Sequence, residues 1–196
     1  LGYPDTGMPY EESFLRRLYD GCRVSASRWG RTETWRPDGQ DFHFMRSGCH
    51  STYTAASVLR DLSDVLALVN PDTVYVTAPG DCHGDHDALG RFTTQAVAAM
   101  ENPPALYYYL IHADRTDIWP ERDAERFRLP PMAADHPLLR CAAERRPLPD
   151  GFPPAEKYSL IQSYTSQDPA AYNGYLLAFA KNDELVFRVE RLPSRT

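Results

Sequence analysis

The spacing of hydrophobic positions predicts several amphipathic helices along the chain. Apolar residues recur at helical intervals in segments that predict helices at Glu11–Tyr19, Thr52–Val69, Asp85–Met100 and Glu156–Ser166. The pattern at Tyr172–Phe179 favours a continuation of the last helix. That helix is expected to turn three apolar side chains inward, namely Leu160, Ile161 and Tyr164.

Compact runs of β-branched and aromatic residues predict strands between these helices. They lie at Thr73–Ala78, Leu106–Ile111 and Leu185–Val189. Phe42 and Phe44 alternate with polar neighbours, which favours a further strand at Gln40–Met45. The order helix, strand, loop, helix, strand is typical of an α/β fold with a mostly parallel sheet flanked by helices.

One domain is the expected organisation of the chain. Its 196 residues are 42% hydrophobic, which is enough for a single core of ordinary size. No repeat and no Gly/Ser linker divides residues 1–196. Residues 113–154 are rich in proline and charge and lack periodicity, so they are expected to form a long excursion that shapes a binding site.

Charge and hydropathy argue against nucleic-acid binding and against a membrane-spanning helix. The formal net charge of −6, with no basic run, argues against a nucleic-acid-binding protein. No stretch approaches 18 consecutive apolar residues, so no membrane-spanning helix is predicted.

The cysteines leave the compartment undetermined. Cys22, Cys49, Cys82 and Cys141 match neither a paired CxxC zinc site nor a dense disulfide framework. Most of them are expected to be small buried residues, although one or two disulfides remain open. Together with the proline-rich loops, they favour an extracellular location.

The densest group of chemically active side chains is the run Asp81-Cys82-His83-Gly84-Asp85-His86-Asp87. It follows a predicted buried strand and opens a helix, and ligands of open α/β sheets bind at the carboxyl ends of strands. Neutral imidazoles bind zinc, and carboxylates orient them or accept protons from water. Singly, these residues could be a helix cap and surface polar groups. Their combination at a strand end favours an active site.

The segment Pro79 to Gly90 resembles the second signature of the PIG-L/LmbE-like family of zinc-dependent N-deacetylases, a D-x-H-x-D-H pattern at the end of a strand. That family often has proline where this chain has Gly84. Tyr3 to Met8 is similar to the family's early Asp-Gly segment, and Glu156 to Gln167 resembles its late K-…-Y-x-S-Q helix. The resemblance implies a Rossmann-like, LmbE-type fold.

The resemblance also implies roles for individual residues. His86 matches a zinc ligand, and Asp85 matches the neighbouring carboxylate that supports the catalytic site. His83 matches the histidine that stabilises transition-state charge or transfers a proton. Asp5 matches a position that contacts sugar hydroxyls. Independently of the family, His112 follows a predicted strand and is expected to line the substrate pocket.

One departure from the family is serious. Its first signature, an H-P-D-D motif, supplies a histidine and an aspartate to zinc and a general base, and it does not occur in this sequence. We therefore expect a domain that lacks its first strands and is completed by an N-terminal segment, cleaved or on a separate chain. Three other histidines are expected to be ordinary hydrogen-bonded residues: His43, His50 and His136.

The sequence thus predicts a Zn²⁺-dependent hydrolase that removes an N-acyl group, preferably N-acetyl, from an amino sugar or glycan. Two alternatives stay open. The chain could be a catalytically inactive glycan-binding relative, or a different metallohydrolase such as a phosphoesterase that uses Asp81, His83 and His86 as ligands.

Overall fold

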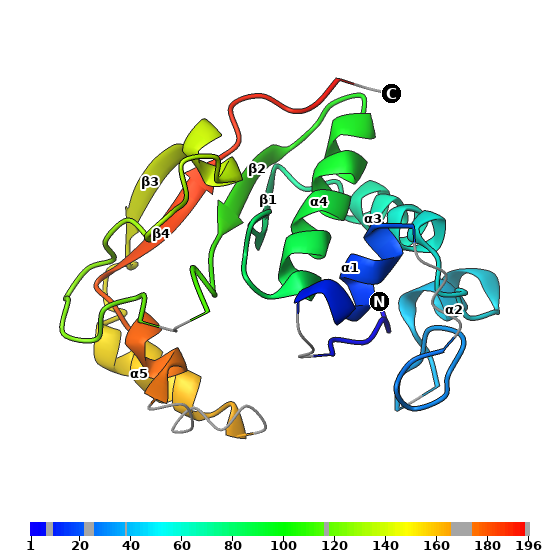
Figure 1. Cartoon of the computed structure of the whole chain (residues 1–196), viewed down its shortest axis with the longest axis horizontal. Coiled ribbons are helices and arrows are strands. Elements are labelled where there is room, and N and C mark those ends of the chain that lie inside the picture. The colour runs from blue at the N-terminus through cyan, green and yellow to red at the C-terminus, as the bar shows by residue number, and fades with distance from the viewer. Residues whose placement is uncertain (7–9, 22–25, 38, 116–117, 166–173, 195–196) are drawn as a thin grey trace.

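The computed structural model describes residues 1–6, 10–21, 26–37, 39–115, 118–165 and 174–194. Its strands form one sheet in the order β1-β2-β4-β3 (Figure 1). The strands are β1 (Thr73–Thr77), β2 (Ala105–Tyr109), β3 (Ala142–Pro147) and β4 (Asp183–Arg188). β1 and β2 pair in parallel, whereas β4 runs antiparallel to both β2 and β3. The α/β class is confirmed, but the sheet is mixed, so the expectation of a mostly parallel sheet is wrong.

Helices precede and follow the parallel pair of strands. The α-helices are α1 (Phe14–Tyr19), α2 (Phe42–Ser47), α3 (Ala55–Val69), α4 (Gly84–Ala99) and α5 (Pro154–Gln162). Short 3₁₀ helices occupy η1 (Tyr10–Glu12), η2 (Pro137–Arg140) and η4 (Leu176–Phe179). In the described ranges, none of these helices has the length and apolar character needed to cross a membrane.

The unit β1–α4–β2 forms the centre of the fold. α4 lies so close to β1 that a Cβ atom on Gly90 would stand 2.4 Å from the Thr77 carbonyl oxygen. On its other side α4 packs against α1 and α3, where Phe92, Phe14 and Val58 are buried together. Figure 1 shows α1, α3 and α4 grouped together and α5 apart from them, beyond the start of β4.

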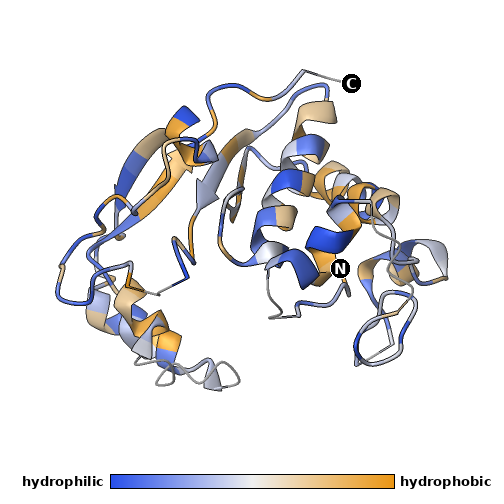
Figure 2. Cartoon of the chain, in the orientation of Figure 1, coloured by the Kyte–Doolittle hydropathy of each residue, from blue (hydrophilic) through white to orange (hydrophobic). Residues whose placement is uncertain are grey.

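The main core lies on the sheet. Hydrophobic residues run along β4, where Leu185, Val186 and Phe187 are buried (Figure 2). Trp119 and Phe127, from the long excursion, are buried in the same core. The excursion also contains β3, which the sequence did not predict. Its three charged residues, Glu144, Arg145 and Arg146, are consecutive, and the strand exists because it pairs with β4 over its whole length.

Two local predictions need correction. Gln40–Met45 is no strand: its residues enter α2, because the Asp41 side chain caps that helix by accepting a hydrogen bond from the Phe44 N–H at 3.0 Å. Leu160 and Tyr164 are not turned inward, since they are 53% and 64% exposed. α5 therefore has no buried face.

The cysteine prediction also fails for the residues that the structure describes. Cys49 is exposed, Cys82 and Cys141 are half-buried, and all three are free thiols. Cys22 lies outside the described residues, as do four residues of the family-like segments, Gly7, Met8, Ser166 and Gln167.

Candidate metal centre

The loop after β1 is held by a buried carboxylate. Asp81 is fully buried, and its Oδ1 accepts a hydrogen bond from the His83 N–H at 2.8 Å. Its Oδ2 accepts from the N–H groups of Ile111 and His112, at 3.0 and 3.1 Å. Asp81 thereby joins the chain after β1 to the chain after β2, and it brings two histidine-bearing segments to one edge of the sheet.

Two histidines stack at the start of α4. His83 precedes the first helical residue and His86 lies in the first turn, and their ring centroids are 4.3 Å apart. His86 Nδ1 lies 3.4 Å from Asp81 Oδ1. A carboxylate behind one ring nitrogen is the usual support of a metal-binding histidine, because it orients the ring and leaves the other nitrogen for the metal.

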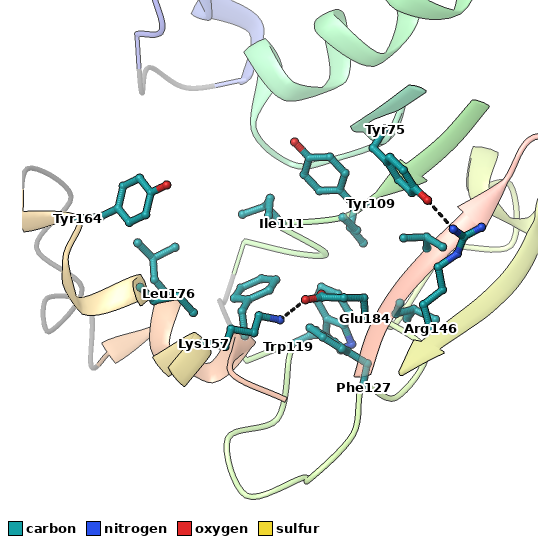
Figure 3. Close-up of a pocket in the computed structure, with 15 residues that line it drawn as sticks. Tyr75, Tyr109, Ile111, Trp119, Phe127, Arg146, Lys157, Tyr164, Leu176 and Glu184 are labelled. Carbon is teal, nitrogen blue, oxygen red and sulfur yellow. Dashed lines mark hydrogen bonds and ion pairs between the residues drawn. The ribbon is translucent and has the colours of Figure 1, made fainter. Parts of the chain in front are cut away.

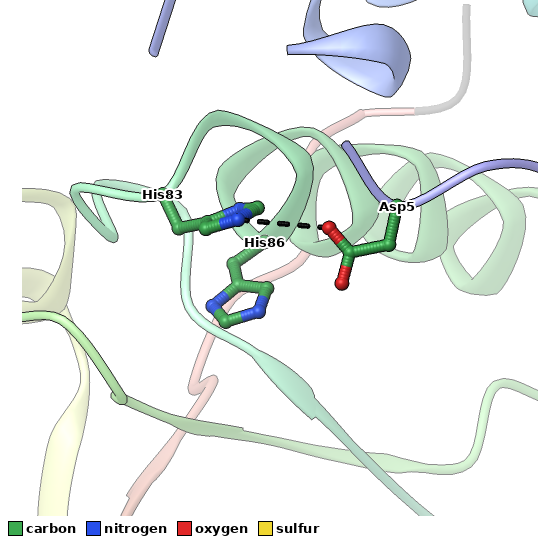
Figure 4. Close-up of side chains that lie close together, drawn as sticks. All are labelled: Asp5, His83 and His86. Carbon is green, nitrogen blue, oxygen red and sulfur yellow. Dashed lines mark ion pairs between the residues drawn. The ribbon is translucent and has the colours of Figure 1, made fainter. Parts of the chain in front are cut away.

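The N-terminal segment brings a carboxylate to this pair. Asp5 Oδ1 lies 3.6 Å from His83 Nε2, and Figure 4 shows the Asp5 side chain turned towards the two imidazoles. Asp85 holds this segment: its Oδ2 accepts from the Thr6 N–H and hydroxyl at 2.9 and 3.0 Å, and its Oδ1 accepts from the Leu15 N–H at 2.7 Å. Asp85 thus faces the N-terminal segment.

The start of α4 packs so closely against η1 and Ser13 that position 84 has room only for glycine. A Cβ atom on Gly84 would stand 2.3 Å from the Tyr10 carbonyl oxygen and 2.6 Å from Ser13 Oγ. The PIG-L/LmbE-like family often has proline at this position, and a proline ring would meet the same atoms. Gly84 therefore lets η1, and with it the N-terminal segment, approach α4.

Asp5, His83 and His86 form a set of ligands that fits a metal ion. Each offers one ligand atom, and these atoms all lie within 4.8 Å of one another. Two imidazoles and a carboxylate are a common ligand set for catalytic zinc, with a further position left for water. Burial, followed by the neighbouring charge of His86, lowers the pKa of His83, which favours the neutral imidazole that a metal requires.

His112 stands beside this set. Its ring centroid is 5.8 Å from that of His83 and 5.5 Å from that of His86, although His112 is not part of the group whose ligand atoms lie within 4.8 Å of one another. Tyr175 stacks on His112 with a centroid distance of 5.4 Å, and its hydroxyl donates a hydrogen bond to the Ile111 carbonyl oxygen. The structure thus brings His83, His86, Asp5 and His112 together, whereas Asp85 faces away from them.

The sequence did not predict how two further residues shape this site. It gave Asp81 a role only as a metal ligand of the alternative phosphoesterase, because the contacts of Asp81 to Ile111 and His112 depend on tertiary structure. Tyr175 gave no local signal, because it reaches His112 from a distant part of the chain.

The remaining histidines have structural partners. His50 Nδ1 contacts Asp41, and His136 Nε2 lies 3.2 Å from the Gly80 carbonyl oxygen. His43 forms a second group with Asp61 and Asp64. There Asp61 already accepts hydrogen bonds from the Tyr3 and Ser51 hydroxyls at 2.7 and 2.8 Å, so we interpret this group as an anchor for the N-terminal segment.

Comparison with known proteins gives the chain no relatives. It matches no protein-family model, no curated protein and no solved structure.

Proposed function

We propose that this chain is a metal-dependent hydrolase that removes an N-acyl group from an amino sugar or glycan. The observation that carries the proposal is the convergence of Asp5, His83 and His86, whose ligand atoms lie within 4.8 Å of one another. Their location at the carboxyl ends of two parallel strands supports an active site. The likeness of the Asp81–His86 run to N-deacetylases supports the choice of an amide as the bond that is cleaved.

Zn²⁺ is the metal that this ligand set suits best. A zinc ion bound there would act as a Lewis acid that lowers the pKa of water and polarises an amide carbonyl. In this proposal His83 is a ligand, in addition to the proton-transfer role that the resemblance implies. Asp5 likewise becomes a ligand, in addition to a contact with sugar hydroxyls.

The other residues of the site have supporting roles. Asp81 orients His86, and Asp85 fixes the segment that carries Asp5. In this proposal His112, whose ring centroid lies 5.5 Å from that of His86, takes the proton from the attacking water and returns it to the leaving nitrogen. In the balanced reaction the water oxygen joins the acyl carbon, the C–N bond breaks, and the amine nitrogen receives the proton.

Metal content separates ligands from proton-transfer residues. After incubation with zinc and dialysis, the wild-type chain is expected to retain one zinc by mass spectrometry. His83→Ala, His86→Ala and Asp5→Ala should lose it, whereas His112→Ala should retain it and release amine more slowly from N-acyl glucosamine. The exposed Asp72→Asn is the control and should behave as wild type.

Three results would contradict this proposal or favour another function. Wild-type zinc content in both histidine variants would contradict the assigned ligands. Release of phosphate from a phosphate ester, without amide cleavage, would assign a phosphoesterase. Binding of glycans without any hydrolysis by the zinc-loaded chain would assign a binding protein.

A further inference from the structure

A cavity of about 560 Å³ is lined by residues of the sheet, of α5 and of η4. Leu185 of β4 and Ile161 of α5 are among them. Tyr109, Leu176, Trp119 and Phe127 also line it (Figure 3). Its volume falls in the range of roughly 300 to 1,000 Å³ that small-molecule sites occupy.

The charged groups at the cavity already have partners of opposite charge. Lys157 Nζ contacts Glu184 Oε1 (Figure 3), and Arg146 Nη2 lies 3.1 Å from Glu144 Oε2. Arg146 also donates to the Tyr75 hydroxyl and lies over the Tyr107 ring, 4.3 Å from its centroid. Since each charge is compensated by its partner, the cavity favours an uncharged, apolar ligand.

The segment that follows β2 carries residues of both the cavity and the histidine group, which consists of His83, His86 and His112. Ile111 lines the cavity, and the next residue, His112, stands 5.5 Å from the His86 ring. Tyr175 stacks on His112, and its ring lies 5.6 Å from Phe179, which also lines the cavity. A substrate with its amide at the histidines could therefore place an adjoining chain in the cavity.

We propose that this cavity binds the acyl chain of the substrate, and that the preferred N-acyl group is an aliphatic chain of several carbons rather than acetyl. This inference rests on the proposed function for the position of the amide. An acetyl methyl would leave the cavity unfilled. A longer chain would bury methylenes against Trp119, Phe127 and Ile111, and each buried methylene is worth about fourfold in affinity.

The test measures binding without catalysis. Dissociation constants of N-acyl glucosamines with two, four, six and eight acyl carbons are determined by calorimetry on the metal-free chain. Affinity should rise about fourfold per methylene. Ile161→Trp, which fills the cavity, should abolish this rise, and Tyr109→Ser, which removes part of its wall, should weaken it. Leu139→Trp, at an exposed apolar residue outside the cavity, should leave the series unchanged.

The outcomes separate this inference from the proposed function. Affinity independent of chain length, or a series that both cavity variants leave intact, would overturn the inference. So would self-association that closes the cavity with a second copy of the chain. Zinc-dependent cleavage of all chain lengths at one rate, with flat affinities, would keep the proposed function and overturn the inference. Chain-length-dependent binding without hydrolysis would support the cavity and overturn the proposed function.

Discussion

The carboxylate of Asp85, in the first turn of α4, accepts a hydrogen bond from the Thr6 N–H at 2.9 Å, although 79 positions separate the two residues. The same oxygen accepts from the Thr6 hydroxyl, which in turn accepts from the Phe14 N–H at 3.1 Å. Asp5 directly precedes Thr6. A buried carboxylate on α4 thus positions an exposed carboxylate next to the histidine pair.

Asp85→Asn should loosen the N-terminal segment. An amide would turn an NH₂ group towards donors that now face carboxylate oxygens, and an unsatisfied buried donor costs about 1 to 3 kcal/mol. We expect that loss in the free energy of unfolding measured with urea. Because Asp5 moves with Thr6, zinc affinity should fall by about 10- to 100-fold, the usual effect of losing support for a metal ligand.

Asp72→Asn is the control for this substitution, since Asp72 is exposed. It should leave both the unfolding free energy and the zinc affinity unchanged. If Asp85→Asn lowers stability but leaves zinc affinity at the wild-type value, Asp5 is no zinc ligand.

The histidine pair could be predicted from the sequence. The family resemblance gave Asp5 only a contact with sugar hydroxyls, and its position as a carboxylate partner of the two histidines was not predicted. His83 and His86 lie three positions apart at a helix start, so local geometry alone brings them together. The approach of Asp5 depends on hydrogen bonds from Thr6 and Leu15 to Asp85, across the whole N-terminal region. Such contacts leave no periodic pattern in the sequence.

Asp81→Asn should weaken metal binding by a different route. Asp81 faces His86 Nδ1 and accepts the N–H groups of His83, Ile111 and His112. Burial opposes its ionisation, but the contact with His86 and these donors hold its pKa below the usual value. The neutral amide removes that support, so we expect about 10- to 100-fold weaker zinc binding in a competition titration.

Asp81→Asn should also move His112, because the hydrogen bond from the His112 N–H to Asp81 holds the chain that follows β2. A spectroscopic readout separates the two effects: the His86 and His112 ring signals in NMR should both move, while those of His50 stay in place. Unchanged His86 signals together with wild-type zinc affinity would contradict the role of Asp81.

Gly84 offers a test of the contact between η1 and α4. Its Cβ would stand 2.3 Å from a backbone oxygen, so Gly84→Ala should cost about 1 to 3 kcal/mol in unfolding free energy through overpacking. Gly84→Pro should cost more, because the ring adds atoms to the same space. Equal stability of wild type and Gly84→Pro, measured by urea unfolding, would show that this close contact does not form.

The fold was predictable where local pattern and tertiary pairing agree. β1, α4 and β2 lie within one or two residues of their predicted bounds, since β1 and β2 are compact β-branched and aromatic runs and the apolar residues of α4 recur at helical spacing between turn residues. β3 was missed because an edge strand with Glu144, Arg145 and Arg146 shows no hydrophobic pattern of its own. α2 was misassigned as a strand because Phe42 and Phe44 alternate with polar residues. The hydrogen bond from the Phe44 N–H to the Asp41 side chain caps a helix there instead.

The surroundings of Asp41 predict how the stability of the fold depends on pH. Its buried carboxylate accepts from the Phe44 N–H at 3.0 Å and the Thr34 hydroxyl at 2.8 Å, and it contacts His50. Burial opposes ionisation, but His50 and these donors lower the pKa of Asp41 below its ordinary value. Ionised Asp41 therefore stabilises the fold above the unfolded-state pKa of about 3.9, and this contribution is lost as the pH falls through the folded-state pKa.

The comparison of wild type with Asp41→Asn measures this contribution. At pH 7 the variant should be less stable by about 1 to 3 kcal/mol, because an amide satisfies fewer of the surrounding donors. Below about pH 4 the difference should shrink, since Asp41 of the unfolded wild-type chain then takes up a proton and folded Asp41 follows at lower pH. Asp72→Asn, exposed and distant from α2, should show no such convergence. A difference between wild type and Asp41→Asn that stays constant from pH 7 to pH 3 would mean that the charge of Asp41 does not stabilise the fold.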